Sequence, residues 1–552
     1  MTFGGIESIT AGYHDTGVES YRGNPLIEAL PPIKSVKNIA ESLKIDAHCR
    51  PEDLLASGHV RAHSISRLTD EFFQPLSTHV QLEEKLSIMI RGGYVGRNPK
   101  NGSRQKHLQN GYERLLTGDL SAFRFDEVKS TAQSMSIIGC SGSGKTTTIG
   151  RVLSGYPQVI YHPDYNLEQV VYLKVDCSFD GSLKGICQNF FRALDRVLNT
   201  HYEQRYGMKR HSVENMLAIM AQIANSHALG VLIIDEIQHL SRSKSGGSEK
   251  MLNFFVTLVN TIGLPVVLVG TPKAKEIFEV DLRSARRSAG FGAIFWEPMK
   301  QYQSNGRPGE WHAFTNKLWK LQWLKHRDEL LTDDIRNTWY DLSQGVLDIV
   351  VKLFVLAQLR AIATGIERIT SGLLRQVYQD ELGPVHPMLA ALRSNDAEKI
   401  AEYSDLRLKD TDKRLLELQS QIDEASIASD EIDELVSDDE KRLYMMLSQF
   451  GYDDSSLLLE TVKRAFKEHP DASLQELLPI VSSWLSAPEH DDVKAPPKKQ
   501  KTKRLKKDEW HTLPTEDLRF LSSQSSSKDE AYETLKSSGL IFPMNKWMDK
   551  VG

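Results

Sequence analysis

Residues 136–153 read SIIGCSGSGKTTTIGRVL, and this stretch decides the fold. An apolar run leads into a glycine-rich turn, and a helix-like pattern follows. The motif G-x-x-x-x-G-K-[ST], which binds nucleotide phosphates in this strand–turn–helix setting, is filled by Gly139, Gly144, Lys145 and Thr146. A chance Gly/Ser loop is the alternative, and both flanking elements argue against it.

The residues of this loop predict a site for ATP and Mg²⁺. Backbone N–H groups of the loop and the positive end of the following helix would hold the phosphates. Lys145 would reach the β- and γ-phosphate oxygens, and the Thr146 hydroxyl would bind Mg²⁺. The residues expected to contact the nucleotide are Gly139, Cys140, Ser141, Gly142, Ser143, Gly144, Lys145, Thr146 and Thr147.

A second motif supplies two adjacent carboxylates. In VLIIDEIQHL, residues 231–240, Asp235 and Glu236 end an apolar run, where two carboxylates are costly unless they are used. Asp235 would bind Mg²⁺ through its water shell, and Glu236 would orient the water that attacks the γ-phosphate. No signature of a pocket for a small acceptor accompanies the pair. The pair of carboxylates therefore predicts ATP hydrolysis rather than transfer of the phosphate by a kinase.

Two further features could complete a hydrolytic site. The run LPVVLVGTP ends at Thr271, whose hydroxyl could sense the γ-phosphate; a Thr that only starts a turn before Pro272 is the alternative. Downstream, the segment EVDLRSARRSAGFG contains Arg283, Arg286 and Arg287. We expect Arg286 or Arg287 to reach the γ-phosphate of a neighbouring subunit, with a surface salt bridge as the alternative.

The pattern around these motifs predicts an α/β fold. Short β-rich runs alternate with helix-length segments, which is typical of a parallel sheet covered by helices. These runs are residues 134–140, 170–178, 230–236, 264–271 and 292–296. Residues 183–198 have apolar side chains at three- and four-residue spacing, as in a helix that lies on such a sheet. One run separates the two motifs, so that Glu236 follows a different strand from the phosphate loop. This layout is typical of AAA+ P-loop ATPases.

Composition changes divide the chain into five predicted parts. They are an N-terminal extension of modest structure, expected to contact a target selector (1–130), the AAA+ ATPase core (131–310), a helical lid (311–395), a helical C-terminal region (396–490), and a basic linker with a docking tail (491–552). In the lid, residues 333–382 predict three helices with breaks near Gly345 and Gly365. Asp348 lies where many AAA+ lids carry an arginine, which puts a lid-borne nucleotide sensor in doubt.

Overall composition sets limits on partners. The chain has 552 residues, 40% hydrophobic content and a formal net charge of −5, so any contact with nucleic acid must come from local patches. We expect a cytoplasmic protein with no membrane partner, because no secretion signal is recognisable and no run approaches the roughly 20 apolar residues of a membrane span. The four cysteines show no CxxC spacing, which favours incidental thiols over zinc sites or disulfides.

Positive charge gathers in places that could contact DNA. One set near the predicted sheet is Lys184, Arg242, Lys244 and Lys250, with a solvated loop as the alternative. The run KAPPKKQKTKRLKK, residues 494–507, predicts an extended segment for DNA or acidic partners, or else a solubilising linker. Residues 508–552 carry large apolar side chains from Trp510 to Trp547, too many for so short a segment to bury alone. They predict docking on a partner.

Several segments together resemble TnsC, the AAA+ regulators of heteromeric cut-and-paste bacterial transposons. Besides the phosphate loop, the similar segments are IDEIQHLSRSKSGGSEKMLNFFVTLVN, LVGTPKAKEIFE, DLRSARRSAGFGAIFW, DTGVESYRGNPLIEALPP, MIRGGYVGRNPK and GLLRQVYQDELGPVHPML. The resemblance implies a homo-oligomeric ring or filament that assembles on duplex DNA with ATP. It also implies that the protein links a target-selector protein to transposase and endonuclease subunits, and that hydrolysis releases or refuses targets.

Two other functional classes remain open. A replication initiator or helicase-loader ATPase would share the core and a DNA-bound ring. It would usually end in a winged-helix domain, and no strand pattern of that kind follows the lid. An adaptor with a purely structural nucleotide site would need neither Asp235 nor Glu236.

Overall fold

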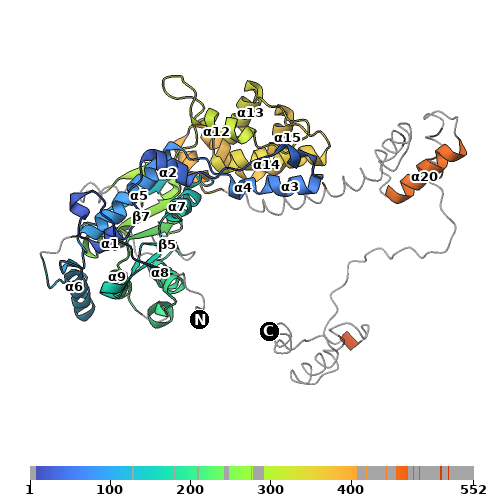
Figure 1. The fold of residues 1–552 in the computed structure, drawn as a ribbon. Helices are drawn as coiled ribbons and strands as arrows, with labels where there is room; N and C mark the ends of the chain where they lie inside the picture. The colour runs from blue at the N-terminus through green and yellow to red at the C-terminus, as the bar shows by residue number, and fades with distance from the viewer. Residues whose placement is uncertain are drawn as a thin grey trace. The chain divides into compact units, whose positions relative to one another are not determined.

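A computed structural model describes most of the chain and divides it into two compact units, residues 1–441 and 442–552. The described ranges are 8–126, 130–177, 181–207, 211–240, 248–274, 291–406 and 455–469, with single positions outside them. The first unit contains a central sheet and a helical lid (Figure 1).

The central sheet contains all five strands that the sequence predicted. They are β2 (Ser134–Ile138), β5 (Tyr172–Asp176), β6 (Val231–Asp235), β7 (Val266–Gly270) and β8 (Ala293–Phe295). All pairings are parallel, in the spatial order β5-β6-β7-β2-β8. The α/β AAA+ fold is therefore confirmed. β7 separates β2 from β6, so the phosphate loop and Glu236 follow strands that are not neighbours.

Alternate side chains of each strand enter different cores, because successive residues of a strand point to opposite faces. In β6, Leu232 and Ile234 pack under α8 (Leu183–Leu198), α9 (Val213–Ser226) and α10 (Ser248–Val256). Val231 and Ile233 pack on the other face. The helices of that face are α1 (Pro25–Glu28), α2 (Val36–Leu43), α5 (Ser77–Val95) and α7 (Lys145–Leu153). The predicted apolar stripe on α8 is buried as far as Val197, and Leu198 is partly buried.

A second, three-stranded sheet was missed by the sequence analysis. β3 (Val159–His162) and β4 (Leu167–Val170) form an antiparallel hairpin, and β1 (Ile9–Thr10) pairs in parallel with β3. The predicted run 170–178 joined the end of β4 to β5. The two strands are separate because Val170 completes the hairpin, and its turn holds Asn166 at a φ of 43°.

The N-terminal residues are not an extension of modest structure. Leu82, Leu86 and Ile90 of α5 are fully buried beneath the sheet. Two other helices, α3 (Gly58–Ser66) and α4 (Leu68–Glu71), pack beside the lid, where Figure 1 shows them next to α14. α6 (Ser103–Thr117) packs on α9. Its buried helices are short and lie between polar, turn-rich stretches, so no long apolar pattern marks them in the sequence.

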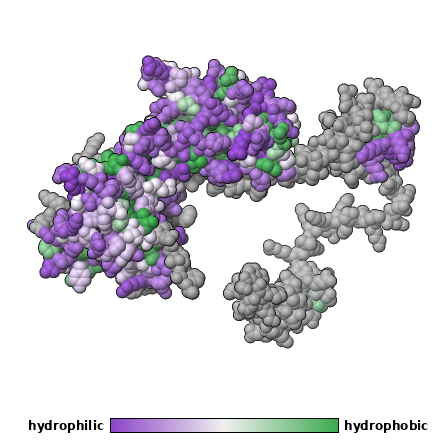
Figure 2. Space-filling view, in the orientation of Figure 1, coloured by the Kyte–Doolittle hydropathy of each residue, from purple (hydrophilic) through white to green (hydrophobic). Residues whose placement is uncertain are grey.

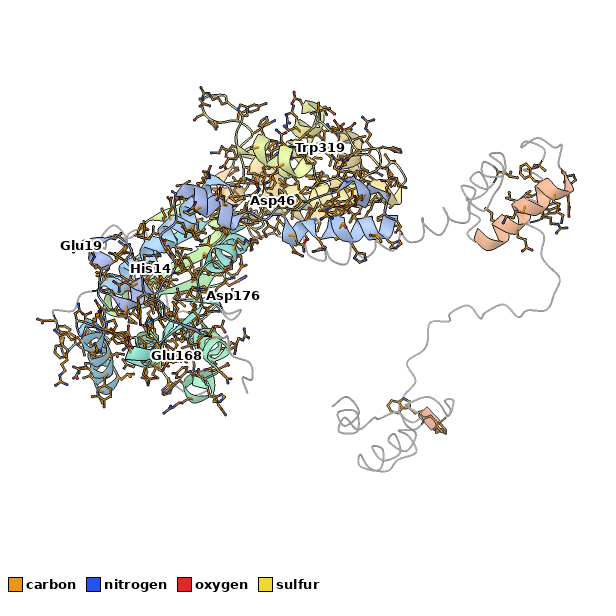
Figure 3. The ribbon with its side chains drawn as sticks, viewed as in Figure 1. His14, Glu19, Asp46, Glu168, Asp176 and Trp319 are labelled. Atoms are coloured by element: carbon orange, nitrogen blue, oxygen red, sulfur yellow. The ribbon has the colours of Figure 1, made fainter. Side chains whose placement is uncertain are left out.

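Two ion pairs join the N-terminal segment to the lid. Arg61 of α3 is 2% exposed and forms a bidentate pair with Glu367 at 2.6 and 2.8 Å. It also donates to the carbonyl oxygen of Trp323 at 2.6 Å. On the surface, Asp46, which Figure 3 labels, pairs with Lys317 at 3.1 Å. The lid is therefore fixed to a segment far away in the sequence.

The lid is helical, as predicted. Its helices are α12 (Glu310–Trp319), α13 (Asp333–Ser343), α14 (Leu347–Ala363), α15 (Ser371–Glu381), α16 (His386–Ser394) and α17 (Ala397–Tyr403). The predicted breaks are confirmed, since Gly345 and Gly365 have φ values of 70° and 69°, a conformation that favours glycine. Buried aromatic rings form its centre, with Trp339 stacked on Phe354 at 5.2 Å.

In the second unit the structure describes α20 (Ser455–Glu468) and a few single residues. Leu458, Val462 and Ala465 of α20 are buried, and the Arg464 guanidinium lies 4.9 Å from the ring centre of Trp484. The unit boundary after Lys441 falls inside the predicted region 396–490. The predicted basic linker and docking tail lie outside the described residues, apart from Trp510, His511 and Phe520.

The described surface is mainly hydrophilic on the side shown in Figure 2, with hydrophobic side chains scattered over it. None of the described helices has the length and apolar character needed to cross a membrane. Cys140, Cys177 and Cys187 are buried free thiols, and Cys49 is partly buried.

Candidate nucleotide site

The phosphate loop joins β2 to α7 and depends on its glycines. Gly142 and Gly144 have φ values of 74° and 90°, where a side chain would strain the backbone. At Gly139 an added Cβ would lie 2.5 Å from the carbonyl oxygen of Trp296. The Trp296 indole donates to the Ser143 carbonyl at 2.8 Å and supports the loop from β8. Such a turn, placed before a helix N-terminus, forms an anion-binding concavity.

The Lys145 ammonium is held inside this loop. Its Nζ donates to the carbonyl oxygens of Gly139 at 2.7 Å and Cys140 at 2.8 Å. The Lys145 residue is only 8% exposed. The positive charge is therefore fixed beside the concavity in which phosphates would lie.

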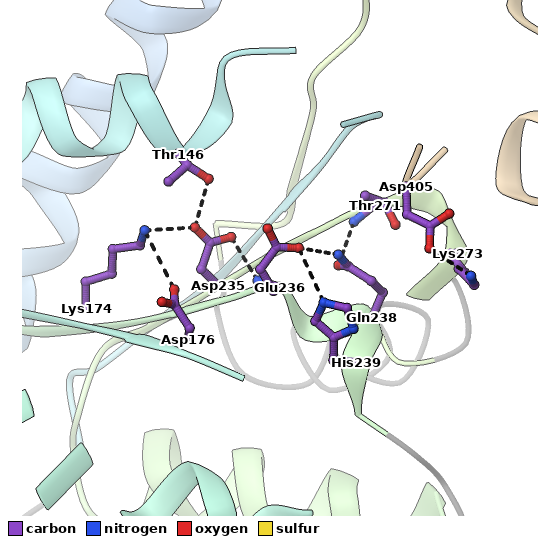
Figure 4. Close-up of polar contacts among 10 residues, drawn as sticks. All are labelled: Thr146, Lys174, Asp176, Asp235, Glu236, Gln238, His239, Thr271, Lys273 and Asp405. Atoms are coloured by element: carbon purple, nitrogen blue, oxygen red, sulfur yellow. Dashed lines mark hydrogen bonds and ion pairs between the residues drawn. The ribbon is translucent and has the colours of Figure 1, made fainter. Parts of the chain in front are cut away.

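Thr146 and Asp235, the two predicted Mg²⁺ ligands, lie within hydrogen-bond distance of each other. The Thr146 hydroxyl donates to Asp235 Oδ2 at 2.9 Å, and Asp235 Oδ1 accepts the Glu236 backbone N–H at 2.8 Å (Figure 4). Lys174 of β5 also contacts Asp235 Oδ2, at 3.1 Å. A hydroxyl and a carboxylate at this spacing are hard oxygen donors of the kind that Mg²⁺ prefers.

Glu236 and Thr271 are joined through Gln238, which the sequence analysis did not single out. Gln238 Nε2 donates to Glu236 Oε2, and Gln238 Oε1 accepts the Thr271 backbone N–H at 3.2 Å (Figure 4). Glu236 itself has a φ of 56° and a ψ of 39°, a left-handed conformation that is uncommon outside glycine and is frequent at functional sites. The amide side chain therefore connects the ends of β6 and β7.

The Thr271 hydroxyl is buried without a hydrogen-bond partner among the described residues, and Thr271 is 3% exposed. A buried hydroxyl in this state costs free energy unless something else binds it. Since Thr271 lines the cavity described next, its unsatisfied hydroxyl fits a site that receives a polar ligand.

A cavity of about 360 Å³ lies between the sheet and the lid, and these groups line it. Its lining includes Thr146, Asp235, Glu236 and Thr271, and on the lid side Asp348 and Lys352. The N-terminal segment contributes Thr69, Phe72, Phe73, Gln74 and His79. The sequence analysis missed this contribution, because no motif marks it and it lies far from the loop in sequence.

His79 is an aromatic wall of this cavity. Burial lowers the pKa of His79 to about 4, so the ring is neutral near pH 7. Its Nδ1 accepts the Leu76 backbone N–H at 3.2 Å, which places the proton on Nε2. The ring stacks on Trp296 at 5.5 Å and lies 5.1 Å from the Phe73 ring. This part of the cavity suits a flat, aromatic ligand group.

The lid contacts the phosphate loop directly. The Asp348 backbone N–H donates to the Gly142 carbonyl at 2.9 Å, and the Asp348 carboxylate pairs with Lys352 at 2.8 Å. In a second contact between the loop and the lid, the Ser141 N–H donates to the Ser404 carbonyl oxygen, just after α17, at 2.7 Å. A carboxylate therefore lies at the loop where many AAA+ lids carry an arginine, and Lys352, which pairs with it, lies one turn further along α14.

The remaining predicted site residues are placed only in part. Arg286 and Arg287 lie outside the described residues, as do Arg242 and Lys244. Lys184 lies in the first turn of α8 and is partly buried, whereas Lys250 on α10 is exposed. These residues therefore stay predictions.

Two stretches of the chain match known protein families. Residues 128–278, which contain the phosphate loop, Asp235 and Glu236, match an AAA domain. Residues 505–551 match the Tn7 transposition regulator TnsC. The chain is a TnsC-like AAA+ ATPase. Nucleotide binding follows from the AAA domain of this TnsC-like chain, and regulation of transposition follows from its C-terminal match.

Solved structures also show similarity to this TnsC-like chain. Cdc6p from Pyrobaculum aerophilum is 15% identical, with a TM-score of 0.28, covering 58% of this chain and 94% of that one. The ORC2 protein of Aeropyrum pernix is 14% identical, with a TM-score of 0.30, covering 60% and 95%. Drosophila ORC bound to DNA is 12% identical, with a TM-score of 0.29, covering 81% and 90%. No functional conclusion follows at these TM-scores. No curated protein matches the sequence significantly.

Proposed function

We propose that this TnsC-like chain assembles on target DNA with ATP and couples target selection to activation of a transposase. The observation that carries the proposal is the presence of two features in one chain. An AAA domain holds the nucleotide site, and a separate C-terminal segment matches TnsC. A regulator needs both a nucleotide-dependent state and a means of transmitting that state to its partners.

In the proposed site, the phosphates of ATP lie on the loop 139–147, and Thr146 and Asp235 hold Mg²⁺. The left-handed glycines, the Lys145 ammonium and the unsatisfied Thr271 hydroxyl all fit a triphosphate. Mg²⁺ would supply positive charge that neutralises the phosphate oxygens. The aromatic wall with His79 and Phe73 would receive the base.

For hydrolysis, we assign Glu236 as the group that orients the attacking water and takes up its proton. Gln238 holds the Glu236 carboxylate, and the Thr271 hydroxyl donates toward the γ-phosphate or the water. Lys145 stabilises charge that develops on the β- and γ-phosphate oxygens.

A neighbouring subunit would complete the site. Among the described residues, those lining the cavity include no arginine. We therefore propose that Arg286 or Arg287 of an adjacent copy stabilises the transition state, so that hydrolysis depends on assembly. For DNA, the proposed phosphate contacts are Lys184, Arg242, Lys244 and Lys250, supported by the basic run 494–507.

Electron microscopy with duplex DNA and a non-hydrolysable ATP analogue tests the proposal. We expect rings or filaments on DNA that require the analogue, and none with Lys145→Ala. Adding the transposase and endonuclease subunits should then give transposition that depends on this chain. Binding of isolated subunits to DNA without nucleotide would contradict the proposal. Loading of a replicative helicase, with no effect on transposition, would instead support the initiator or helicase-loader alternative.

A further inference from the structure

Lys174 lies beside the proposed metal site without belonging to any of the motifs. It is on β5, in register with Ile233 of β6, so the two side chains share a face of the sheet. Its Nζ lies 3.1 Å from Asp235 Oδ2 and 3.8 Å from Asp176 Oδ1 (Figure 4). The ammonium group therefore lies between two carboxylates.

These two carboxylates differ in their surroundings. The Asp235 side chain is 4% exposed, whereas the Asp176 side chain is 69% exposed and lies at the exposed end of the strand (Figure 3). A buried carboxylate without a positive partner is strongly destabilising. Lys174 gives Asp235 such a partner while no metal is bound. The Asp176 carboxylate is a second, solvent-exposed acceptor for the same ammonium group, which would need to move only a short distance to reach it.

The oxygen that Lys174 contacts is one that a bound metal would also need. Asp235 Oδ2 is also the oxygen that accepts the Thr146 hydroxyl. An ammonium at 3.1 Å and a divalent cation at the same carboxylate would repel each other. Metal binding must therefore either displace Lys174 or be weakened by it.

We propose that Lys174 is a positioning residue that neutralises Asp235 in the metal-free protein and moves to Asp176 when Mg²⁺ binds. The inference rests on the proposed role of Asp235 in holding the metal. Its consequence is that Lys174 and Asp176 together set the concentration of free Mg²⁺ at which nucleotide binding becomes tight.

Equilibrium binding of a fluorescent ATP analogue to the full chain, titrated with Mg²⁺ and repeated in EDTA, tests this. Lys174→Met removes the competing charge and should lower the Mg²⁺ midpoint by about fivefold or more. Asp176→Asn removes the second acceptor and should raise the midpoint. Lys174→Arg keeps the charge and should stay close to the wild type. Opposite shifts from two neighbouring substitutions would not follow from general damage to the fold.

Thermal unfolding gives a second measurement that does not depend on hydrolysis. In EDTA without nucleotide, Lys174→Met should unfold at a lower temperature than the wild type, because Asp235 loses its partner. The difference should disappear with saturating Mg²⁺ and nucleotide. Asp176→Asn should unfold at the wild-type temperature in EDTA.

The outcomes separate the inference from the proposed function. A wild-type chain whose nucleotide binding ignores Mg²⁺ would overturn the metal role of Asp235 itself. If the wild type does respond to Mg²⁺ while the Lys174→Met midpoint is unchanged, only the role of Lys174 fails. Weaker binding of the analogue by Lys174→Met at saturating Mg²⁺ would show that Lys174 contacts the nucleotide instead, which also overturns the inference.

Discussion

Lys145 is proposed to bind the phosphates and Glu236 to orient the attacking water. Substituting Lys145 should therefore affect ATP binding, whereas substituting Glu236 should affect hydrolysis. Lys145→Ala removes the phosphate contact and should abolish both ATP binding and assembly on DNA. Glu236→Gln leaves the loop, Thr146 and Asp235 in place, so ATP should still bind. Turnover should fall on the order of 10²-fold or more, because the water loses its base. Nucleotide binding and steady-state hydrolysis measure the two effects.

The rate of release from DNA shows whether ATP hydrolysis limits how long the protein stays bound. If it does, Glu236→Gln should remain on DNA long after the wild type has left in an ATP chase, and it should support transposition with relaxed target control. Rapid release of this variant would exclude that role. Loss of all transposition would instead favour a motor that hydrolysis drives along DNA.

Gln238 gives a finer prediction. Gln238→Ala should lower kcat about tenfold with little change in ATP affinity, because the Glu236 carboxylate loses the amide donor of Gln238. Gln238→Glu keeps an acceptor for the Thr271 N–H but cannot donate to Glu236. If the Glu236 contact is the important one, Gln238→Glu should be at least as slow as Gln238→Ala, because it also places a second carboxylate against Glu236. A kcat that stays at the wild-type value in both would show that Gln238 has no positioning role.

Residues within motifs were easier to predict than the residues that support them. Thr146 follows from the fixed spacing of its motif and Asp235 from its place at the end of an apolar run, and the structure brings them to 2.9 Å. Lys174, Gln238 and His79 have no such spacing. They reach the site because parallel strands end at one edge and because the N-terminal segment returns to the lid, and neither of these is visible in a local pattern.

Among the elements, α3 is attached to the lid by a buried ion pair as well as by apolar packing of Ala62 and Ile65. Removing one partner of such a pair costs about 3–5 kcal/mol. Glu367→Gln should therefore destabilise the lid by that order. The exposed pair of Arg67 and Glu71 is the matched control, and Glu71→Gln should cost less than about 1 kcal/mol. Chemical denaturation followed by the fluorescence of the lid tryptophans measures both.

The same pair predicts a dependence on pH. Burial alone would raise the pKa of Glu367, but hydrogen bonds from Arg61 and the Lys325 N–H outweigh it and lower the pKa below 4.5. A carboxyl with a lowered folded pKa stabilises the fold above its unfolded pKa and loses that contribution as pH falls through the folded value. The difference between wild type and Glu367→Gln should be constant from pH 7 to about 4.5 and shrink below that. A difference that grows on acidification would contradict this assignment.

Elements with strong periodicity were predictable and short ones were not. The buried strands and α8 follow from their apolar patterns, whereas β3 and β4 have four residues each and were merged with a neighbour or missed. α3 and α4 were not predicted from the sequence, because the residues they pack against lie in the lid, about 250 or more positions away. Trp323 and Glu367 are examples of these residues.

For the whole molecule, we expect hydrolysis to require neighbouring copies, because the proposed arginine comes from another subunit. Activity per subunit should rise with protein concentration and with duplex DNA. Arg286→Ala or Arg287→Ala should remove this rise while leaving ATP binding intact. A rate per subunit that stays flat over a wide dilution series, with DNA present, would contradict the proposal.

The C-terminal segment should be separable from the ATPase. Deleting residues 508–552 should leave ATP binding unchanged and abolish coupling to the transposase subunits, because the segment matching TnsC begins at 505, well outside the AAA domain. Binding of the nucleotide analogue and a transposition assay measure the two effects. Loss of nucleotide binding in the truncated chain would mean that this segment belongs to the ATPase.

The burial of α5 beneath the sheet has a consequence for how the chain is made. α5 ends at Val95, but the strands that cover it are complete only at Phe295. At synthesis rates of about 5–20 residues per second, the apolar face of α5 waits on the order of ten seconds for its partners. During that interval the nascent chain exposes Leu82, Leu86 and Ile90 at the ribosome. A chaperone that shields this helix, or a translation pause before β7, should therefore decide how much active protein a cell obtains.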